Sequence, residues 1–325
     1  MITRRRALTF AAFAPALLTR TARAQAWPNR PVRIIVPFPP GGGGDTIARI
    51  VGAKLTEIWG QQIIVENKGG AGGNLASDAT ARSAPDGYTL FLAGDFLVTN
   101  AFIYPKLSYD PVADFATVSL VVRFPVVIAA PNSLPAQNFK EFMELAKSRS
   151  GNPLTYASPG YGTSPHLAAE LLKREANIPL THVPYRGAAP AIQDLIPGRV
   201  DSFFNNSAPT VPLMRQGQIR GIAVTSAKRA GAMPDLPTAA ESGLPGFDVS
   251  GWYAFVTPAR TPPEIVAKMH ADTVTALADP TVRGKLEDLA LFVEGSSPTE
   301  LENMMKAERI KWEPVIKAAG IAIKD

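Results

Sequence analysis

The sequence predicts an α/β protein with two lobes, and three observations support this. Short β-branched runs alternate with amphipathic stretches along the chain, a rhythm that is typical of parallel βαβ units. The chain has 325 residues, more than one hydrophobic core usually carries. Two apolar runs, at residues 118–122 and 126–130, are separated by residues 123–125. We expect the chain to pass from one lobe to the other at this break.

The first 26 residues are predicted to be an export signal. Three arginines, Arg4, Arg5 and Arg6, precede an apolar run at residues 7–18, and Ala-x-Ala sequences allow cleavage after Ala24 or Ala26. The apolar run is shorter than the roughly 20 residues of a membrane span. Its consecutive arginines are compatible with either the Sec or the twin-arginine route.

Removing this segment changes the charge of the protein. The chain has 33 basic and 28 acidic residues, and the segment contains five arginines and no acid, so 28 of each sign remain. A mature chain with zero net charge and no basic cluster gives no support for nucleic-acid or membrane binding. The sequence contains no cysteine, so disulfides and thiolate chemistry are excluded and the core alone must hold the fold.

Two strand–glycine–helix junctions form the first candidate site. A β-branched strand at residues 32–36 is followed by prolines, by the glycines 41–44, and after Asp45 by an amphipathic helix that ends near Gly60. Glycines at residues 69–73 repeat this arrangement before a second helix. Such loops leave backbone N–H groups at helix starts, where they favour a carboxylate or phosphate. The alternative for the first loop is a tight turn with Asp45 as the helix cap.

Nucleotide fingerprints do not match the first glycine loop. The GxGxxG pattern requires a glycine where this chain has Thr46, and the GxxxxGK[ST] pattern requires a lysine that this loop lacks. The later strand ends supply further candidates at residues 158–164, 185–187 and 205–207. Arg186 could pair with a carboxylate, although an isolated arginine also suits a surface ion pair.

Catalytic and metal-binding patterns are not evident. The histidines His166, His182 and His270 do not have the spacing of a zinc site, and no serine lies in a G-x-S-x-G elbow. His166 follows Ser164 by two residues, which is not a spacing that shares a helix face. We therefore expect neither a metal, nor a cofactor, nor an enzyme.

Several motifs together resemble one family. They are PFPPGGGGD at residues 37–45, ENKGGAGGN at 66–74, APDGYTL at 84–90, YASPGYGTSPH at 156–166, VPYRGAAPA at 183–191, GQIRGIAVTS at 217–226 and the run at 236–259. With the export signal, they resemble the Bug family, the TctC-type periplasmic solute-binding proteins of tripartite tricarboxylate transporters. The resemblance covers essentially the whole mature chain, with its motifs in order.

The resemblance implies a two-lobed, type II periplasmic-binding-protein fold with two crossovers. One lobe would comprise residues 27–125 and 248–325, and the other residues 126–247. A monomer in the periplasm would close its lobes over a small organic acid and deliver it to the membrane permease subunits. First-lobe contacts would come from Phe38, Pro40, Gly41, Gly42, Gly43, Gly44, Asp45, Ala71, Gly72, Gly73 and Asn74. Second-lobe contacts would come from Ser158, Gly160, Gly162, Thr163, Ser164, His166, Tyr185, Arg186, Gly187 and Asn205.

One departure from the family pattern bears on the ligand. Relatives commonly carry an acid just after the strand that ends near Phe204, where this chain has Asn205 and Asn206. If that acid binds an amino group, its loss favours a ligand without one. A ligand sensor on the same fold is an alternative function, and an exported hydrolase or lyase is a more distant one.

Overall fold

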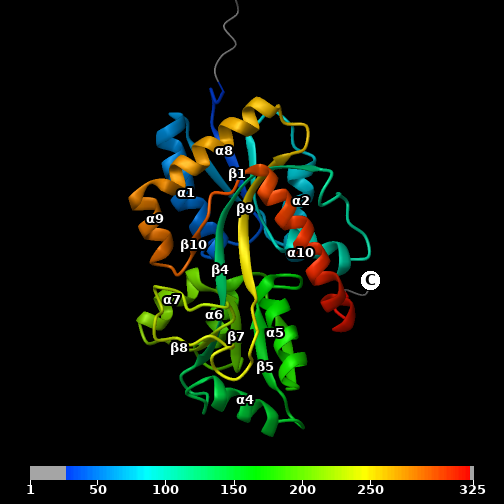
Figure 1. Cartoon of the computed structure of the whole chain (residues 1–325), viewed down its shortest axis with the longest axis vertical. Coiled ribbons are helices and arrows are strands. Elements are labelled where there is room, and N and C mark those ends of the chain that lie inside the picture. Colours follow the sequence, from blue (N-terminus) through cyan, green and yellow to red (C-terminus); the bar gives the residue numbers. More distant parts are fainter. Residues whose placement is uncertain (1–26, 323–325) are drawn as a thin grey trace, which may run out of the picture.

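A computed structural model describes residues 27–322 of the chain and shows two lobes stacked along its long axis (Figure 1). The predicted export signal and its cleavage sites lie outside the described residues. Within residues 27–322, no helix is both long and apolar enough to cross a membrane.

The first lobe is the upper half of Figure 1; the described chain begins in it, and its last helix runs down from it to end beside the second lobe. Its elements before the crossing are β1 (Val32–Val36), α1 (Gly43–Trp59), β2 (Ile63–Asn67), η1 (Ala71–Gly73), α2 (Asn74–Ala81), β3 (Thr89–Gly94), α3 (Phe96–Thr99) and η2 (Asn100–Phe102). Its elements after the return are β9 (Ser250–Pro258), α8 (Pro263–Ala278), α9 (Pro280–Glu287), β10 (Phe292–Val293) and α10 (Pro298–Ala318).

The second lobe is the lower half of the same view, and β4 (Phe115–Pro131) leads into it. It contains α4 (Phe139–Ser148), β5 (Leu154–Ser158), α5 (Ser164–Ala176), β6 (Leu180–Pro184), α6 (Ala188–Leu195), β7 (Ser202–Asn206), α7 (Ser207–Arg215) and β8 (Ile219–Val224). The strand order is β2-β1-β3-β9-β4-β7-β5-β6, and β8 and β10 pair with β4 beside this path.

The predicted parallel units are confirmed in both lobes. Strand β1 pairs in parallel with β2 and β3, and β5 pairs in parallel with β6 and β7. Strand β9 returns antiparallel to both β3 and β4. The carboxyl ends of the parallel strands in each lobe therefore lead into the helices whose beginnings face the other lobe.

The two apolar runs on either side of residues 123–125 belong to one continuous strand, β4, which passes from one lobe to the other. Strand β4 pairs with β9 as far as Pro125 and with β7 from Val126 onward. A proline cannot donate to a strand ladder, and Pro125 stands where the pairing partner changes. Elements α3, η2 and β10 were not predicted, since each is too short to carry a periodic signal.

Alternating side chains place a core on each face of the sheet. In β1, Val32, Ile34 and Val36 pack with α1, α8 and α9, whereas Ile35 packs on the opposite face with residues of α2, α3 and α10. The same period of two recurs in the second lobe, where Val126 and Ile128 of β4 face one core and Val127 and Ala129 face the other. Helices thus cover both faces, as a largely parallel sheet requires.

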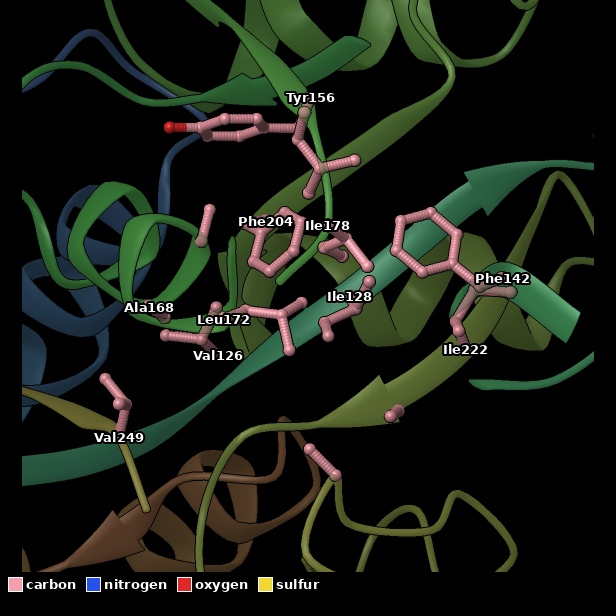
Figure 2. Close-up of a cluster of buried hydrophobic side chains, with 14 of the residues drawn as sticks. Val126, Ile128, Phe142, Tyr156, Ala168, Leu172, Ile178, Phe204, Ile222 and Val249 are labelled. Atoms are coloured by element: carbon pink, nitrogen blue, oxygen red, sulfur yellow. The ribbon is translucent and has the colours of Figure 1, made fainter. Parts of the chain in front are cut away.

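Figure 2 shows the core that underlies the second lobe. Val126 and Ile128 of β4 lie between Phe204 of β7, Leu172 of α5 and Phe142 of α4. The ring of Tyr156 borders this cluster, and its hydroxyl points away from it. This packing fixes the strands and helices whose ends build the second-lobe side of the site.

Helix α10 adds a third connection between the lobes, besides β4 and β9. Near its start, Leu301 and Met305 are buried in a first-lobe core. Near its end, Trp312 and Ile316 are buried in the same cluster as Phe142 and Leu172 of the second lobe. A helix that packs on both lobes limits how far they can separate about the two strands.

Candidate functional site

Two adjoining cavities lie between the lobes, and Phe38 and Pro159 line both. The inner cavity has a volume of about 20 Å³ and the outer cavity about 240 Å³. The inner volume is close to that of one water molecule. In this conformation the lobes are therefore closed on each other at the inner cavity, and a larger molecule could enter only if they separated.

Direct contacts hold the lobes in this arrangement. The hydroxyl of Thr99 donates to the carbonyl of Gly162 at 2.9 Å, and the hydroxyl of Ser207 donates to the carbonyl of Ala290 at 3.2 Å. A Cβ atom added to Gly72 would lie 2.9 Å from the carbonyl oxygen of Tyr161. Glycine at this position allows the first-lobe loop to approach the second-lobe backbone.

The structure brings twelve of the predicted contact residues to these cavities. Those at the inner cavity are Phe38, Gly42, Gly43, Thr163, Ser164 and Asn205. Those at the outer cavity are Phe38 again, with Ala71, Gly72, Gly73, Gly160, Tyr185 and Arg186. The two glycine loops thus face neighbouring cavities, one loop on each, on either side of Phe38.

The remaining predicted residues lie behind the cavities and line neither. They are Pro40, Gly41, Gly44, Asp45, Asn74, Ser158, Gly162, His166 and Gly187. Asp45 accepts a hydrogen bond from the Gly41 amide at 3.1 Å and forms an ion pair with Arg49 at 2.9 Å. Asn74 accepts hydrogen bonds from Asn100 at 2.8 Å and Tyr109 at 2.7 Å. These side chains position the loops.

Helix α1 begins earlier than the sequence suggested. Its cap is Gly42, and Asp45 lies within the first turn, where its carboxylate reaches back to the Gly41 amide. Burial acts to raise the pKa of Asp45, but the hydrogen bonds from Arg49 and from the Gly41 amide outweigh it and lower the pKa. The alternative of Asp45 as the helix cap is therefore wrong, and the capping position is left to a glycine without a side chain.

The beginnings of four helices converge on the inner cavity. The caps of α1, α5 and α7, which are Gly42, Thr163 and Asn206, all line it, and so does Ala188, the first residue of α6. Within the described structure, no capping residue of these four helices accepts a side-chain hydrogen bond from the first amides, and the Asp95 carboxyl accepts one from the Ser164 amide at the beginning of α5. Their N–H groups and dipoles make the cavity attractive to an anion without any cationic side chain.

A stacked histidine pair, with His166 buried and His182 half-buried, supports the loop between β5 and α5. The rings of His166 and His182 stack with centroids 4.3 Å apart. The Gly162 amide donates to Nδ1 of His166 at 3.3 Å, and Nε2 of His182 lies 2.7 Å from the Ser158 hydroxyl. Burial lowers the pKa of each histidine to about 3, so both rings are neutral at pH 7. His166 therefore positions the loop from behind the cavity.

One acid at the centre of the site, Asp95, was not predicted from the sequence. Asp95 follows β3 directly, is 4% exposed, and lines the inner cavity beside Asn206 and Tyr253. Its position just after a buried parallel strand was a usable signal, because ligands lie beyond the carboxyl ends of such strands. Phe96, Phe124 and Tyr253 also line the cavity, and no local pattern marked them.

Burial raises the pKa of Asp95 to about 8, an effect that the neighbouring Ser164 opposes and the more distant Glu308 reinforces. The carboxyl group is therefore largely protonated at pH 7. Residues 27–322 contain no group of three or more histidine and acidic side chains placed to hold a metal ion.

The fold and this site define a two-lobed solute-binding protein. Residues 47–321 match the family described as the tripartite tricarboxylate transporter family receptor, TctC, and the chain belongs to this family. The resemblance inferred from the motifs is thus confirmed.

Individual relatives extend this match over the chain. The "UPF0065 protein in tcbD-tcbE intergenic region" of Pseudomonas sp. (strain P51) is 39% identical over 97% of this chain and 94% of its own length. Among solved structures, "R. palustris Rpa4515 with adipate" has a TM-score of 0.88 and 35% identity, over 91% of this chain and 100% of that one. "MatC (Rpa3494) from Rhodopseudomonas palustris with bound malate" has a TM-score of 0.84 and 36% identity, over 89% of this chain and 100% of that one.

Proposed function

We propose that this protein is a periplasmic solute-binding protein that captures a small organic acid between its lobes and delivers it to a tripartite tricarboxylate-type transporter. The observation that carries this proposal is the convergence of four helix beginnings on one buried cavity. A carboxylate placed there would receive backbone hydrogen bonds and favourable dipoles from both lobes at once. Two solved relatives, one with adipate and one with bound malate, support a carboxylate ligand.

The helix beginnings that would contact an anion are divided between the two lobes, so complete binding requires the lobes to close. Helix α1 belongs to the first lobe and α5, α6 and α7 belong to the second, so an anion is fully surrounded only when the lobes meet. A ligand shifts the open–closed equilibrium by its difference in affinity for the two states. We propose lobe boundaries at residues 125/126 and 247/248, which the change of pairing partner in β4 supports.

The first test is direct binding. The mature protein is unfolded and refolded to remove any carried ligand and then screened by thermal shift against mono-, di- and tricarboxylates and aromatic acids. A ligand at 100 times its dissociation constant adds about 2.7 kcal/mol to the free energy of unfolding. We expect one class of acid to raise the melting temperature by a few degrees. A folded protein that responds to no acid would contradict the proposal.

The transport step needs a second test in the native organism. Deleting the gene for this chain should abolish uptake of the acid that binds, and restoring it should restore uptake. Unchanged uptake after deletion would mean that the protein binds the acid but does not deliver it to a permease.

A further inference from the structure

The short helix α3 of the first lobe is joined at two points to the loop that leads into α5 of the second lobe. The hydroxyl of Thr99 donates to the carbonyl of Gly162 at 2.9 Å. The carboxyl of Asp95 accepts a hydrogen bond from the Ser164 amide. Asp95 caps α3 and Thr99 follows it by one helical turn, so both side chains project from the same face. We call these two contacts, Thr99–Gly162 and Asp95–Ser164, the α3 latch.

The crossing strand β9 holds Ser164 in place for this contact. A Cβ atom added to Gly251 of β9 would overlap the Ser164 hydroxyl, so only a glycine allows the two to approach so closely. Asp95 is 4% exposed and Ser164 is 1% exposed. The first residue of α5 is therefore enclosed between the first lobe and one of the two strands that connect the lobes (Figure 1).

The α3 latch holds the place that a ligand carboxylate would take. The beginning of α5 is one of the four helix beginnings at the inner cavity, and its first amide is already bonded to Asp95. The cavity volume of about 20 Å³ is close to that of one water molecule, and a carboxylate is larger. A ligand can reach the Ser164 amide only after the Asp95 carboxyl has left it.

The groups around Asp95 provide no positive charge to offset a second anion. They are Ser164 on α5, Tyr253 on β9 and, further away, Glu308 on α10. Among the described residues that line the inner cavity, none is lysine, arginine or histidine. An ionised Asp95 would repel a ligand carboxylate strongly in this buried place.

On these grounds we propose that Asp95 is an internal competitor of the ligand, which must displace its carboxyl from the beginning of α5 in order to bind. This inference rests on the proposed function and adds a regulatory contact to the same site. Molecules in which the α3 latch is formed do not bind, so the latch lowers the apparent affinity in proportion to their fraction. The latch also gives the protein a closed form that does not depend on the ligand.

The proposal predicts that affinity falls as the pH rises through about 8. Burial raises the pKa of Asp95 to about 8 in the free protein, and a ligand carboxylate beside it would raise this pKa further. Below pH 8 the free and the bound protein both carry the proton, so affinity is constant. Above pH 8 binding requires proton uptake, and affinity falls by up to about tenfold per pH unit.

Isothermal titration of the refolded mature protein tests this direction. The probes are malate, adipate and benzoate, which stay ionised between pH 7 and pH 9. Titrations in buffers of different ionisation enthalpy measure both the affinity and the protons exchanged. For any probe that binds, we expect about tenfold weaker binding at pH 9 than at pH 7, with proton uptake close to one at pH 9 and close to zero at pH 7.

Two variants of Asp95 separate competition with the ligand from a structural role. Asp95→Asn keeps a neutral side chain of similar shape and should remove both the fall in affinity between pH 7 and pH 9 and the proton uptake. Asp95→Ala frees the Ser164 amide and should bind the probe at least threefold more tightly than the wild type at pH 7 and at least 30-fold at pH 9. Asp235→Asn, at an exposed acid between β8 and β9, is the matched control and should keep the wild-type pH profile.

Small-angle X-ray scattering without added acid tests the α3 latch itself. A double variant, Asp95→Ala with Thr99→Val, removes both contacts and should have a larger radius of gyration than the wild type. The matched control for Thr99 is Thr275→Val in α8. The hydroxyl of Thr275 donates only to the Ala271 carbonyl of its own helix, at 2.9 Å, so its loss should not change the radius of gyration.

The results that would overturn this proposal differ from those that would overturn the proposed function. Wild-type affinity that is constant or rises between pH 7 and pH 9 would refute competition by Asp95, and so would weaker binding by Asp95→Ala than by the wild type at both pH values. An unchanged radius of gyration in the folded double variant would refute the latch. All three results leave carboxylate binding in place, whereas a folded wild type that binds no acid would refute the proposed function as well.

Discussion

The inner and outer cavities of the interlobe cleft are neighbours, but they offer different chemistry. The inner cavity is small, buried and formed by helix beginnings and a buried acid, with no cationic side chain among its described lining residues. The outer cavity is larger and carries the exposed Arg186. Electrostatic interactions are much stronger where water is excluded. Fixed backbone dipoles in the inner cavity should therefore dominate binding, and the exposed Arg186 should matter little.

The largest expected effect comes from obstructing the inner cavity at Gly43. A Cβ atom added there would overlap the side-chain amide of Asn206 in the opposite lobe. Gly43→Ala should therefore oppose closure by about 1–3 kcal/mol, as overpacking does, and lower ligand affinity roughly 5- to 150-fold. Isothermal titration measures the affinity, and a thermal melt should show the unliganded protein still folded.

The matched control is Gly284→Ala in α9. Both glycines lie in helices, but a Cβ atom at Gly284 would have no neighbour within 4 Å. This change should raise the free energy of unfolding by about 0.5–1 kcal/mol and leave affinity unchanged. Equal affinity losses in the two variants would show that the inner cavity has no special role.

The second largest expected effect is on the pH dependence of stability. It arises at the loop containing Pro159, which lines both cavities. His166 and His182 support this loop, and burial lowers the pKa of each to about 3, below the usual value of 6.5. Between pH 3 and pH 6.5 these histidines bind more protons in the unfolded chain than in the folded one. They therefore contribute stability above pH 6.5 that is lost as the pH falls toward 3. Asp95 acts in the opposite sense, because its raised pKa favours folding as the pH falls from 8.

A double variant, His166→Gln with His182→Gln, isolates the contribution of the histidines. Denaturant unfolding at pH 7, 6 and 5 should show a smaller loss of stability on acidification than in the wild type. The difference between the two proteins removes the effect of Asp95 and of the surface carboxylates. Identical pH dependences would mean that the stacked pair is not held neutral by burial.

The smallest expected effect is at the outer cavity. Arg186→Gln removes the exposed cation, and exposed charge interactions contribute about 0.2–1 kcal/mol. Affinity should therefore fall less than about fivefold, and the loss should shrink as salt is added, because exposed charges are screened. A loss larger than that of Gly43→Ala would reverse the ranking of the two cavities and make Arg186 the principal carboxylate partner.

Much of the fold was predictable from local pattern. The β-branched run of β1, the glycine junction and the amphipathic spacing of α1 each indicated their element, and the motifs indicated the family. The continuity of β4 was not predictable, because a proline inside an apolar run normally marks a break. Pro125 is tolerated in β4 because the pairing partner of the strand changes from β9 to β7 at this residue.

The candidate site divides in the same way. Glycine and hydroxyl residues at strand ends are a local signal of a helix beginning near a ligand, and Gly43, Gly72, Thr163 and Ser164 were expected on that basis. Asp95 and Tyr253 reach the cavity from elements that carry no such signal beyond their position at or near a strand. His166 was expected at the ligand, but the stacking with His182 places it behind the loop.

The sequence by itself determined the class of fold, the glycine-lined helix beginnings and the family, because these depend on residue types at short spacing. Only the tertiary structure decided which helix beginnings share one cavity, which of the predicted residues reach it, and that a buried acid from the first lobe faces two asparagines of the second. Such relations join residues far apart in the chain. They arise from how the lobes close, and no local pattern records that closure.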